Sequence, residues 1–185
     1  SSARMPATTY GNRMDLDLLQ EKIASPALKA IVAHWQQARG ANAMPDLSQL
    51  RPSGMAHQLN IVWIYKYDPQ TGQFTGRLAG NRITEGFGKN FRGARLEDLH
   101  SPEDLPRIYR HMLRVVETPA VYKCGGTLFR KGPVRGVGER IMLPLGNGAA
   151  DGVIGATDYE LAPDTGTDDT IHILGNDITW FSIAR

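Results

Sequence analysis

The sequence contains five histidines that could bind a metal ion or transfer protons: His34, His57, His100, His111 and His172. They lie far apart, and none stands in an HxH, HxxxH or HExxH arrangement, so a metal site would have to be assembled from distant segments. His111 falls on a predicted helix, but the helical period places it beside Arg110 and Arg114, which favours a solvated side chain. We therefore predict no metal site.

Acidic residues occur as two close pairs. Glu97 and Asp98 precede a predicted helix, and Asp158 and Glu160 come at the end of a predicted strand. Paired carboxylates can act as general acid and base, but acids at such positions are usually helix caps and solvated strand ends. No serine lies in a GxSxG context, and the glycine-rich segment lacks the ending of a phosphate-binding loop. We expect no catalytic residues, and an enzyme is the third of three functional hypotheses.

Cys124 is the only cysteine, which excludes an intramolecular disulfide and a CxxC metal site. We expect it to be a small buried apolar residue in a protein of the reducing cytoplasm. A flavin adduct would need a cysteine before the long helix predicted below, whereas Cys124 follows that helix. No cofactor is predicted, and neither haem nor flavin is expected.

Composition limits the remaining function classes. The chain has 185 residues, 41% hydrophobic and 22% charged, which fits one globular domain without a membrane span. The 21 basic and 19 acidic residues give a net charge of +2. The arginines are scattered and do not alternate with stacking aromatic residues, so nucleic acid is not an expected partner.

The elements that must position these residues begin with an apolar stripe at residues 15–39. The Ser25-Pro26 pair, a helix cap followed by proline, divides this stretch into helices at about 15–24 and 26–39, which Gly40 ends. The apolar positions recur at helical spacing: Leu16, Leu19, Ile23, Leu28, Ile31 and Trp35. This stripe must cover either its own sheet or the same helices of a second copy. In a homodimer these six residues would form the interface.

After a proline-punctuated linker the period changes to two. Strands are predicted at about 58–67 and 74–79, followed by short helical turns, a long helix between Ser101 and Thr118, and strands at about 121–130, 136–145 and 153–161. In the fourth strand, alternation places Ile141 and Leu143 toward the core and Arg140 and Met142 on the opposite side. The order predicts an α+β fold: a five-stranded antiparallel sheet with helices inserted between strands two and three, preceded by N-terminal helices.

Five segments follow from these boundaries: a disordered or tag-derived N-terminus (1–14), a helical segment (15–40), a linker (41–55), a core (56–162) and a C-terminal extension (163–185). The extension receives no predicted role.

The stretches "RLAG", "GFGKNFRGARLEDL" and "PLG" resemble the signature of a bacterial PAS-like domain family found largely as stand-alone proteins in alphaproteobacteria. The resemblance covers about residues 35–161 and depends on these positions: Arg77, Leu78, Gly80, Gly88, Phe91, Gly93, Leu96, Asp98, Leu99, Leu143, Pro144 and Leu145. It implies a PAS-like sensory or protein-interaction fold, assigns no catalytic residues, and suggests pairing through the segment before the first strand. On this ground we favour a homodimer that pairs through the apolar stripe.

In such a fold the curved sheet and short helices can enclose a cavity. The candidate lining is Trp63, Tyr65, Phe87, Phe91, Ile108, Met112, Cys124, Leu128 and Ile141. The same residues could also simply fill the core. Two hypotheses follow: a signalling domain that binds a small apolar or amphipathic ligand and contacts a protein partner, or a ligand-free interaction scaffold that uses the sheet face and the N-terminal helices.

Overall fold

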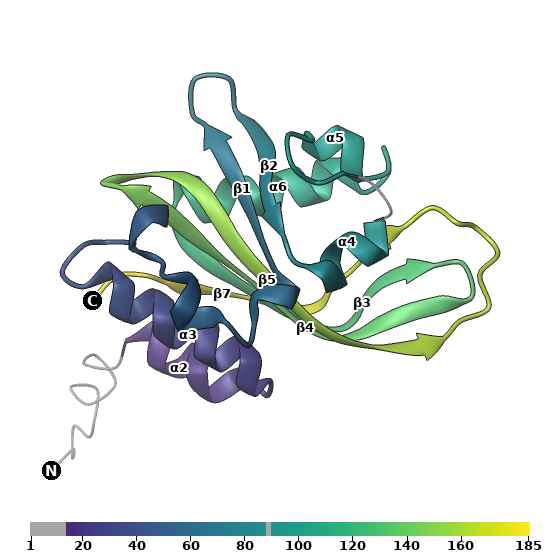
Figure 1. Cartoon of the computed structure of the whole chain (residues 1–185), viewed down its shortest axis with the longest axis horizontal. Helices are drawn as coiled ribbons and strands as arrows, with labels where there is room; N and C mark the ends of the chain where they lie inside the picture. Colours follow the sequence, from purple (N-terminus) through teal and green to yellow (C-terminus); the bar gives the residue numbers. More distant parts are fainter. Residues whose placement is uncertain (1–13, 88–89) are drawn as a thin grey trace, which may run out of the picture.

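The computed structural model describes residues 14–87 and 90–185 (Figure 1). Gly88 and nearly all of the predicted disordered or tag-derived segment 1–14 lie outside this range. Helices cover both faces of one antiparallel sheet, which confirms the predicted α+β, PAS-like architecture. The strands are β1 (Val62–Asp68), β2 (Gln73–Ala79), β3 (Ala120–Lys131), β4 (Val134–Asn147), β5 (Ala149–Pro163), β6 (His172–Ile173) and β7 (Asn176–Ser182).

The sheet has seven strands where the sequence predicts five. Its order is β2-β1-β5-β4-β3-β6, and β7 also pairs with β3. The five predicted strands are all present, and β1 is buried from Val62 to Tyr65, as expected of an inner strand. The two additional strands come from the C-terminal extension, which is therefore part of the sheet.

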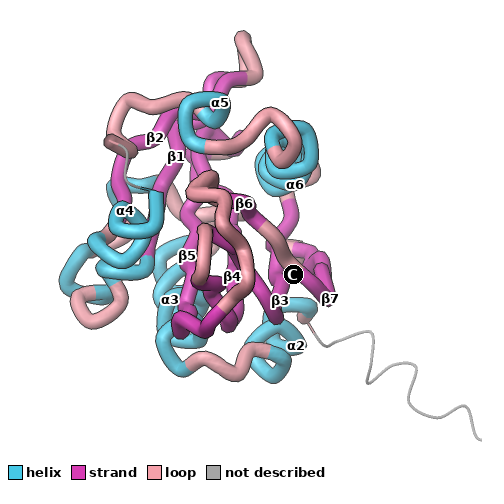
Figure 2. Tube along the Cα trace, turned by 90° about the vertical axis from the view of Figure 1, so that its right-hand side faces the viewer, coloured by secondary structure: helices cyan, strands magenta, loops and turns pink. Residues whose placement is uncertain are grey.

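The N-terminal helices α2 (Asp15–Lys22) and α3 (Pro26–Arg39) cover one face of the sheet (Figures 1 and 2). Ser25 caps α3, because its hydroxyl accepts a hydrogen bond from the Leu28 amide at 3.1 Å. The Trp35 indole donates to the carbonyl of Pro144 on β4 at 2.9 Å. Both predicted helices are thus present and fastened to the sheet. The linker that follows them forms the short turns η1 (Leu47–Gln49), η2 (Pro52–Met55) and η3 (Leu59–Ile61).

The opposite face carries the helices inserted between β2 and β3. These are α4 (Asn81–Phe87), α5 (Leu96–Leu99) and α6 (Leu105–Glu117). Helix α6 starts after Asp104, later than the predicted start at Ser101, because residues 102–104 form a turn. It packs across β3, β4 and β5 with Met112, Val115 and Val116 buried. Figure 2 shows α6 on the opposite side of the sheet from α2 and α3.

Candidate functional site

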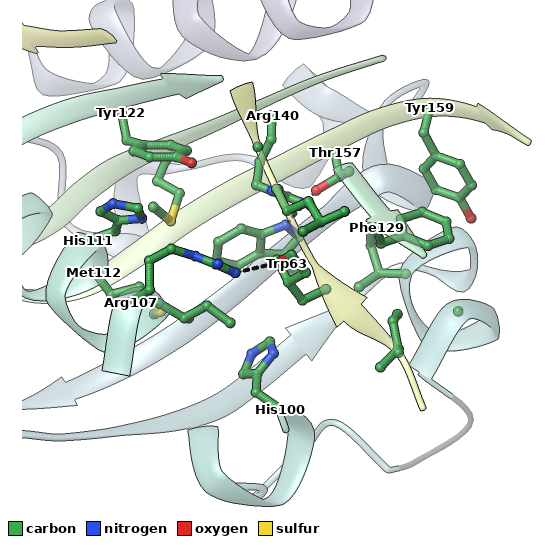
Figure 3. A pocket seen from close by; sticks show the side chains of 18 of the residues that line it. Trp63, His100, Arg107, His111, Met112, Tyr122, Phe129, Arg140, Thr157 and Tyr159 are labelled. Carbon is green, nitrogen blue, oxygen red and sulfur yellow. Dashed lines mark hydrogen bonds between the residues drawn. The ribbon is translucent and has the colours of Figure 1, made fainter. Parts of the chain in front are cut away.

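A cavity lies between α6, α4, the sheet and the C-terminal segment (Figure 3). It encloses a space of about 100 Å³. Sequentially distant segments supply its wall: β1, α4, the loop carrying Phe91, α6, all three long strands β3 to β5, and residues 171–178. The fold therefore places a lined space on the face of the sheet away from α2 and α3.

Aromatic rings form one side of the cavity. Tyr65 lies between Trp63 and Phe91, with ring centroids 5.6 Å and 4.9 Å away. The indole of Trp63 donates a hydrogen bond to the Thr157 hydroxyl at 3.2 Å, which fixes its ring. Burial raises the pKa of Tyr65, so its phenol stays protonated. Only 3% of Tyr65 is exposed.

Arg140 on β4 is a buried cation in the cavity wall, 8% exposed. Its Nη1 donates to the Leu174 carbonyl at 2.7 Å and lies 3.8 Å from the Cys124 Sγ, while Nη2 donates to the Leu128 carbonyl at 2.9 Å. No described carboxylate forms an ion pair with it. Neutral carbonyls thus accept some of the hydrogen bonds of the Arg140 guanidinium, but its positive charge has no counterion among the described residues.

Two further arginines line the same space. Arg107 on α6 binds the carbonyl of Ile173 and lies 3.4 Å from an Asp104 carboxylate oxygen. Arg82 on α4 stacks over the Tyr159 ring at 4.3 Å and donates to the Tyr159 carbonyl at 2.6 Å. The buried Nε of Arg82 has no hydrogen-bond partner in the described part of the chain.

His111 lies beside these cations. Its ring is 5.2 Å from Tyr122 on β3 and 6.1 Å from Trp180 on β7. Burial lowers the pKa of His111, and the positive charges of four arginines lower it further: Arg107, Arg110, Arg114 and Arg140. His111 is half-buried rather than fully solvated, because α6 turns it toward the cavity (Figure 3) and its ring meets Trp180 of β7.

The C-terminal segment closes the cavity. Ile171, Ile173, Leu174, Gly175 and Ile178 contribute apolar surface to its wall. The backbone of this segment is held from both sides, since Arg140 binds the Leu174 carbonyl and Asp104 accepts the Ile173 amide at 3.1 Å.

A family model described as "PAS domain" matches residues 23–156. The chain belongs to the PAS domain family. PAS domains are generally sensory or interaction modules rather than enzymes. Searches among curated proteins and among solved structures found no match. The C-terminal segment that closes the cavity of this PAS domain lies beyond the matched residues. No helix in the described ranges is long and apolar enough to cross a membrane.

Five residues of the predicted cavity lining do lie in its wall: Trp63, Tyr65, Phe91, Ile108 and Met112. Phe87 ends α4, but its side chain lies outside the described part. Cys124, Leu128 and Ile141 are fully buried and do not line the cavity. Whether the five bind a ligand stays a prediction.

The strand register explains the error at Ile141. Arg140 pairs with Cys124 across β3 and β4, while Ile141 pairs with Lys123, so neighbouring residues of β4 face opposite sides of the sheet. Ile141 faces α2 and α3, and Arg140 and Met142 face the cavity side, where both are buried. The predicted alternation is correct, but both faces belong to the core. Cys124, although on the cavity face, is covered by the Arg140 guanidinium and Gly175.

The six stripe residues of the N-terminal helices are at most 1% exposed in the single chain. They pack against the sheet of their own domain, so the prediction that they form a dimer interface is wrong. The same packing covers the sheet face that the scaffold hypothesis needs.

The acidic pairs have structural contacts. Asp98 accepts a hydrogen bond from the Arg95 amide at 2.9 Å, and Glu97 pairs with the Arg95 side chain at 3.8 Å. Asp158 accepts the Ser25 hydroxyl at 2.5 Å. In the described ranges, no group of three histidine, cysteine or acidic side chains could hold a metal ion.

The sequence reasoning missed all the cationic lining residues and the whole C-terminal contribution. Arg82 and Arg107 fall among the scattered arginines, and Arg140 is predicted only to face the side of the sheet opposite Ile141. The available signal was the phase of Arg140, which alternation places on the same face of the strand as the apolar Met142.

Proposed function

We propose that this PAS domain is a sensory module whose cavity binds a small amphipathic molecule. The observation that carries the proposal is the composition of the wall, where aromatic and aliphatic side chains surround a few converging polar groups. Ligand sites in proteins typically combine a mostly apolar wall with a small number of such groups. A core that is only filled for stability has little reason to gather three arginines on one space.

The C-terminal segment offers a route from the cavity to the surface. Ile173 and Leu174 line the cavity, and a few residues later the Ser182 amide donates to Asp15 on α2 at 2.8 Å. The Arg39 guanidinium of α3 donates to the Ile183 carbonyl at 2.8 Å. A ligand that shifts this segment would also change how α2 and α3 are held, and we propose that a protein signalling partner reads this change.

The remaining functional assignments are also proposals. We infer that the domain acts by binding rather than by catalysis, and that it works in the cytoplasm, consistent with its free, buried Cys124. We propose that a homodimer would pair through a surface other than the apolar stripe, which is buried in the single chain. The scaffold alternative has less support, because the sheet face it requires is covered by α2 and α3.

Native mass spectrometry of the purified protein tests the sensory proposal. We expect a bound molecule that is released on denaturation, and we expect Ile108→Trp, which fills the cavity, to abolish it. Leu161→Trp is the matched control, because Leu161 is 61% exposed and outside the lining. If the parent carries no molecule and binds none of a library of small acids, amines and alcohols, the domain is not a sensor of such ligands.

A further inference from the structure

We propose that the cavity selects an organic anion: a small carboxylate carried on one aromatic ring or a short branched apolar chain. This inference rests on the proposed ligand-binding function and adds the chemical class of the ligand.

The wall of the cavity is positively charged. Three arginines line the cavity from three different elements, α4, α6 and β4, whereas no aspartate or glutamate of the described chain lines it. Asp104 compensates part of the Arg107 charge from outside the lining. Arg82 and Arg140 form no ion pair with a described carboxylate. An amine or other cation would meet repulsion here, while an anion would supply the missing counter-charge.

The cavity wall also contains hydrogen-bond donors that are not all satisfied within the described part of the chain. A guanidinium has five N–H groups, and Arg140 makes only the three contacts described above with two carbonyls and a thiol. The Nε of Arg82 is buried without a partner in the described part of the chain. The buried Tyr65 in the wall carries a neutral hydroxyl donor. A carboxylate is the small group that accepts several such hydrogen bonds at once, and it accepts bidentate pairs from arginine.

The rest of the wall defines the body of the ligand. Trp63, Phe91 and Phe129 present aromatic surface, and Ile108, Met112 and Ile173 present aliphatic surface. A space of about 100 Å³ admits a body no larger than a single ring or a short branched chain. A free inorganic anion would leave this apolar surface without a partner, and a long fatty acid would not fit.

The arginines also connect the anion to the closing segment. Arg140 binds the carbonyl of Leu174, and Arg107 binds the carbonyl of Ile173. An anion between these two guanidinium groups would hold both in place and so stabilise the closed segment. Through this link, the charge of a bound ligand would affect the position of the C-terminal segment.

Three probes separate the charge from the body: benzoate, its neutral analogue benzamide, and acetate, which has the charge without the ring. Isothermal titration calorimetry on the full chain measures each affinity. We expect benzoate to bind about tenfold or more tightly than benzamide, because charge-assisted hydrogen bonds are roughly twice as strong as neutral ones. We expect a similar margin over acetate, because acetate leaves the apolar wall without a partner. Benzenesulfonate is a fourth arm that distinguishes a carboxylate-specific site from a general organic-anion site.

The variant pair Arg107→Gln and Arg110→Gln assigns the effect to the cavity. Both residues lie on α6, but only Arg107 lines the cavity and Arg110 is exposed. We expect Arg107→Gln to weaken benzoate about tenfold and leave benzamide unchanged, with Arg110→Gln behaving like the parent. Arg140→Lys, which keeps the charge but loses the planar donors, should also weaken benzoate if its melting curve shows a folded protein.

The outcomes separate the two proposals. If benzamide binds as well as benzoate, or if Arg107→Gln has no effect on a measurable benzoate affinity, the anion inference is wrong and ligand binding stands. If an amine from the library binds instead, the cavity selects cations and the anion inference is wrong. If no probe and no library member binds, the sensory function fails together with the anion inference.

Discussion

Arg140 and Ile141 are neighbours on β4, yet they serve different sides of the molecule. Ile141 packs under the N-terminal helices with no exposed surface, and Arg140 supports the cavity and the C-terminal segment. A charged residue is tolerated at one position because carbonyls of β3 and of the segment receive its hydrogen bonds.

Replacing Ile141 by aspartate should therefore destabilise the protein strongly. We expect a loss of about 3 kcal/mol or more in the free energy of unfolding, because a carboxylate would be buried among apolar side chains. Val137→Asp on the same strand is the control, since Val137 is 37% exposed and should cost much less. Thermal or urea unfolding measures both variants, and equal stability of Ile141→Asp and the parent would contradict the assigned face.

His111 should make anion binding depend on pH. The charged or titratable groups around it are Arg107, Arg110, Arg114, Arg140 and Tyr122. Burial and the arginines lower the pKa of His111 in the empty cavity, so the ring is neutral near pH 7. A bound anion would favour the protonated ring and raise this pKa, so that binding takes up a proton.

Benzoate affinity should therefore rise as the pH falls from about 8 to about 5.5, a range in which benzoate remains ionised. Titration calorimetry in buffers of different ionisation enthalpy measures both the affinity and the proton uptake. In His111→Gln the affinity should be nearly flat over the same range. An equal slope in the parent and the variant would show that another group titrates.

For individual residues, the sequence predicted that β4 alternates between two faces. It did not predict that both faces are buried, one under the N-terminal helices and the other at the cavity. Apolar residues such as Trp63 and Ile108 are assigned to a core by type and period alone. Arg140 could not be placed, because its partners are carbonyls of Leu128 and Leu174, which only the folded sheet brings near.

Among the elements, the best predicted are those with local signals. Ser25 and Pro26 mark the start of α3 by their own chemistry, and the hairpins are marked by their turn residues. The strands β6 and β7 lack such marks, since the segment before them is rich in aspartate, threonine and glycine. They are ordered by pairing with β3 and by contacts with α6, which are tertiary interactions that no local pattern reveals.

Asp104 links the C-terminal segment to the start of α6. It accepts the Ile173 amide, pairs with Arg107, and lies 3.4 Å from the His172 ring. Hydrogen bonding to Asp168, together with the Asp104 charge, raises the pKa of His172. Since the folded pKa is above the unfolded value of about 6.5, this contribution to stability is complete below that pH and is lost as the pH rises through the folded pKa.

Asp104→Asn should loosen the C-terminal segment without unfolding the sheet. We expect amide hydrogen exchange in residues 172–178 to become about tenfold faster, since the charged hydrogen bond to the Ile173 amide is weakened. Glu103→Gln is the matched control, because Glu103 is the exposed neighbour and makes no described contact with the segment. Unchanged exchange in Asp104→Asn would show that β-pairing alone holds the segment.

In the whole molecule, the N-terminal helices cover one face of the sheet. Their stripe is buried against the sheet, and Glu139 of β4 fixes the corner between α2 and α3 by accepting the amides of Ala24 and Ser25 at 3.1 Å and 2.7 Å. Lys123 compensates the Glu139 charge at 3.3 Å. The sequence predicts that the stripe must be covered, but the choice of its own sheet over a second chain depends on tertiary contacts that no local pattern reveals.

Leu19→Asp distinguishes these two coverings. Leu19 has no exposed surface in the single chain, so a charge there should lower the free energy of unfolding by about 3 kcal/mol or more and leave the oligomeric state of the remaining folded protein unchanged. If the stripe instead joined two copies, the same change would convert a dimer into a folded monomer of nearly unaltered local stability. Sedimentation velocity combined with urea unfolding separates the outcomes. Leu18→Asp is the control on the same helix, because Leu18 is only partly buried and should cost less. A folded monomer obtained from a dimeric parent by Leu19→Asp would restore the interface and require α2 and α3 to leave their own sheet.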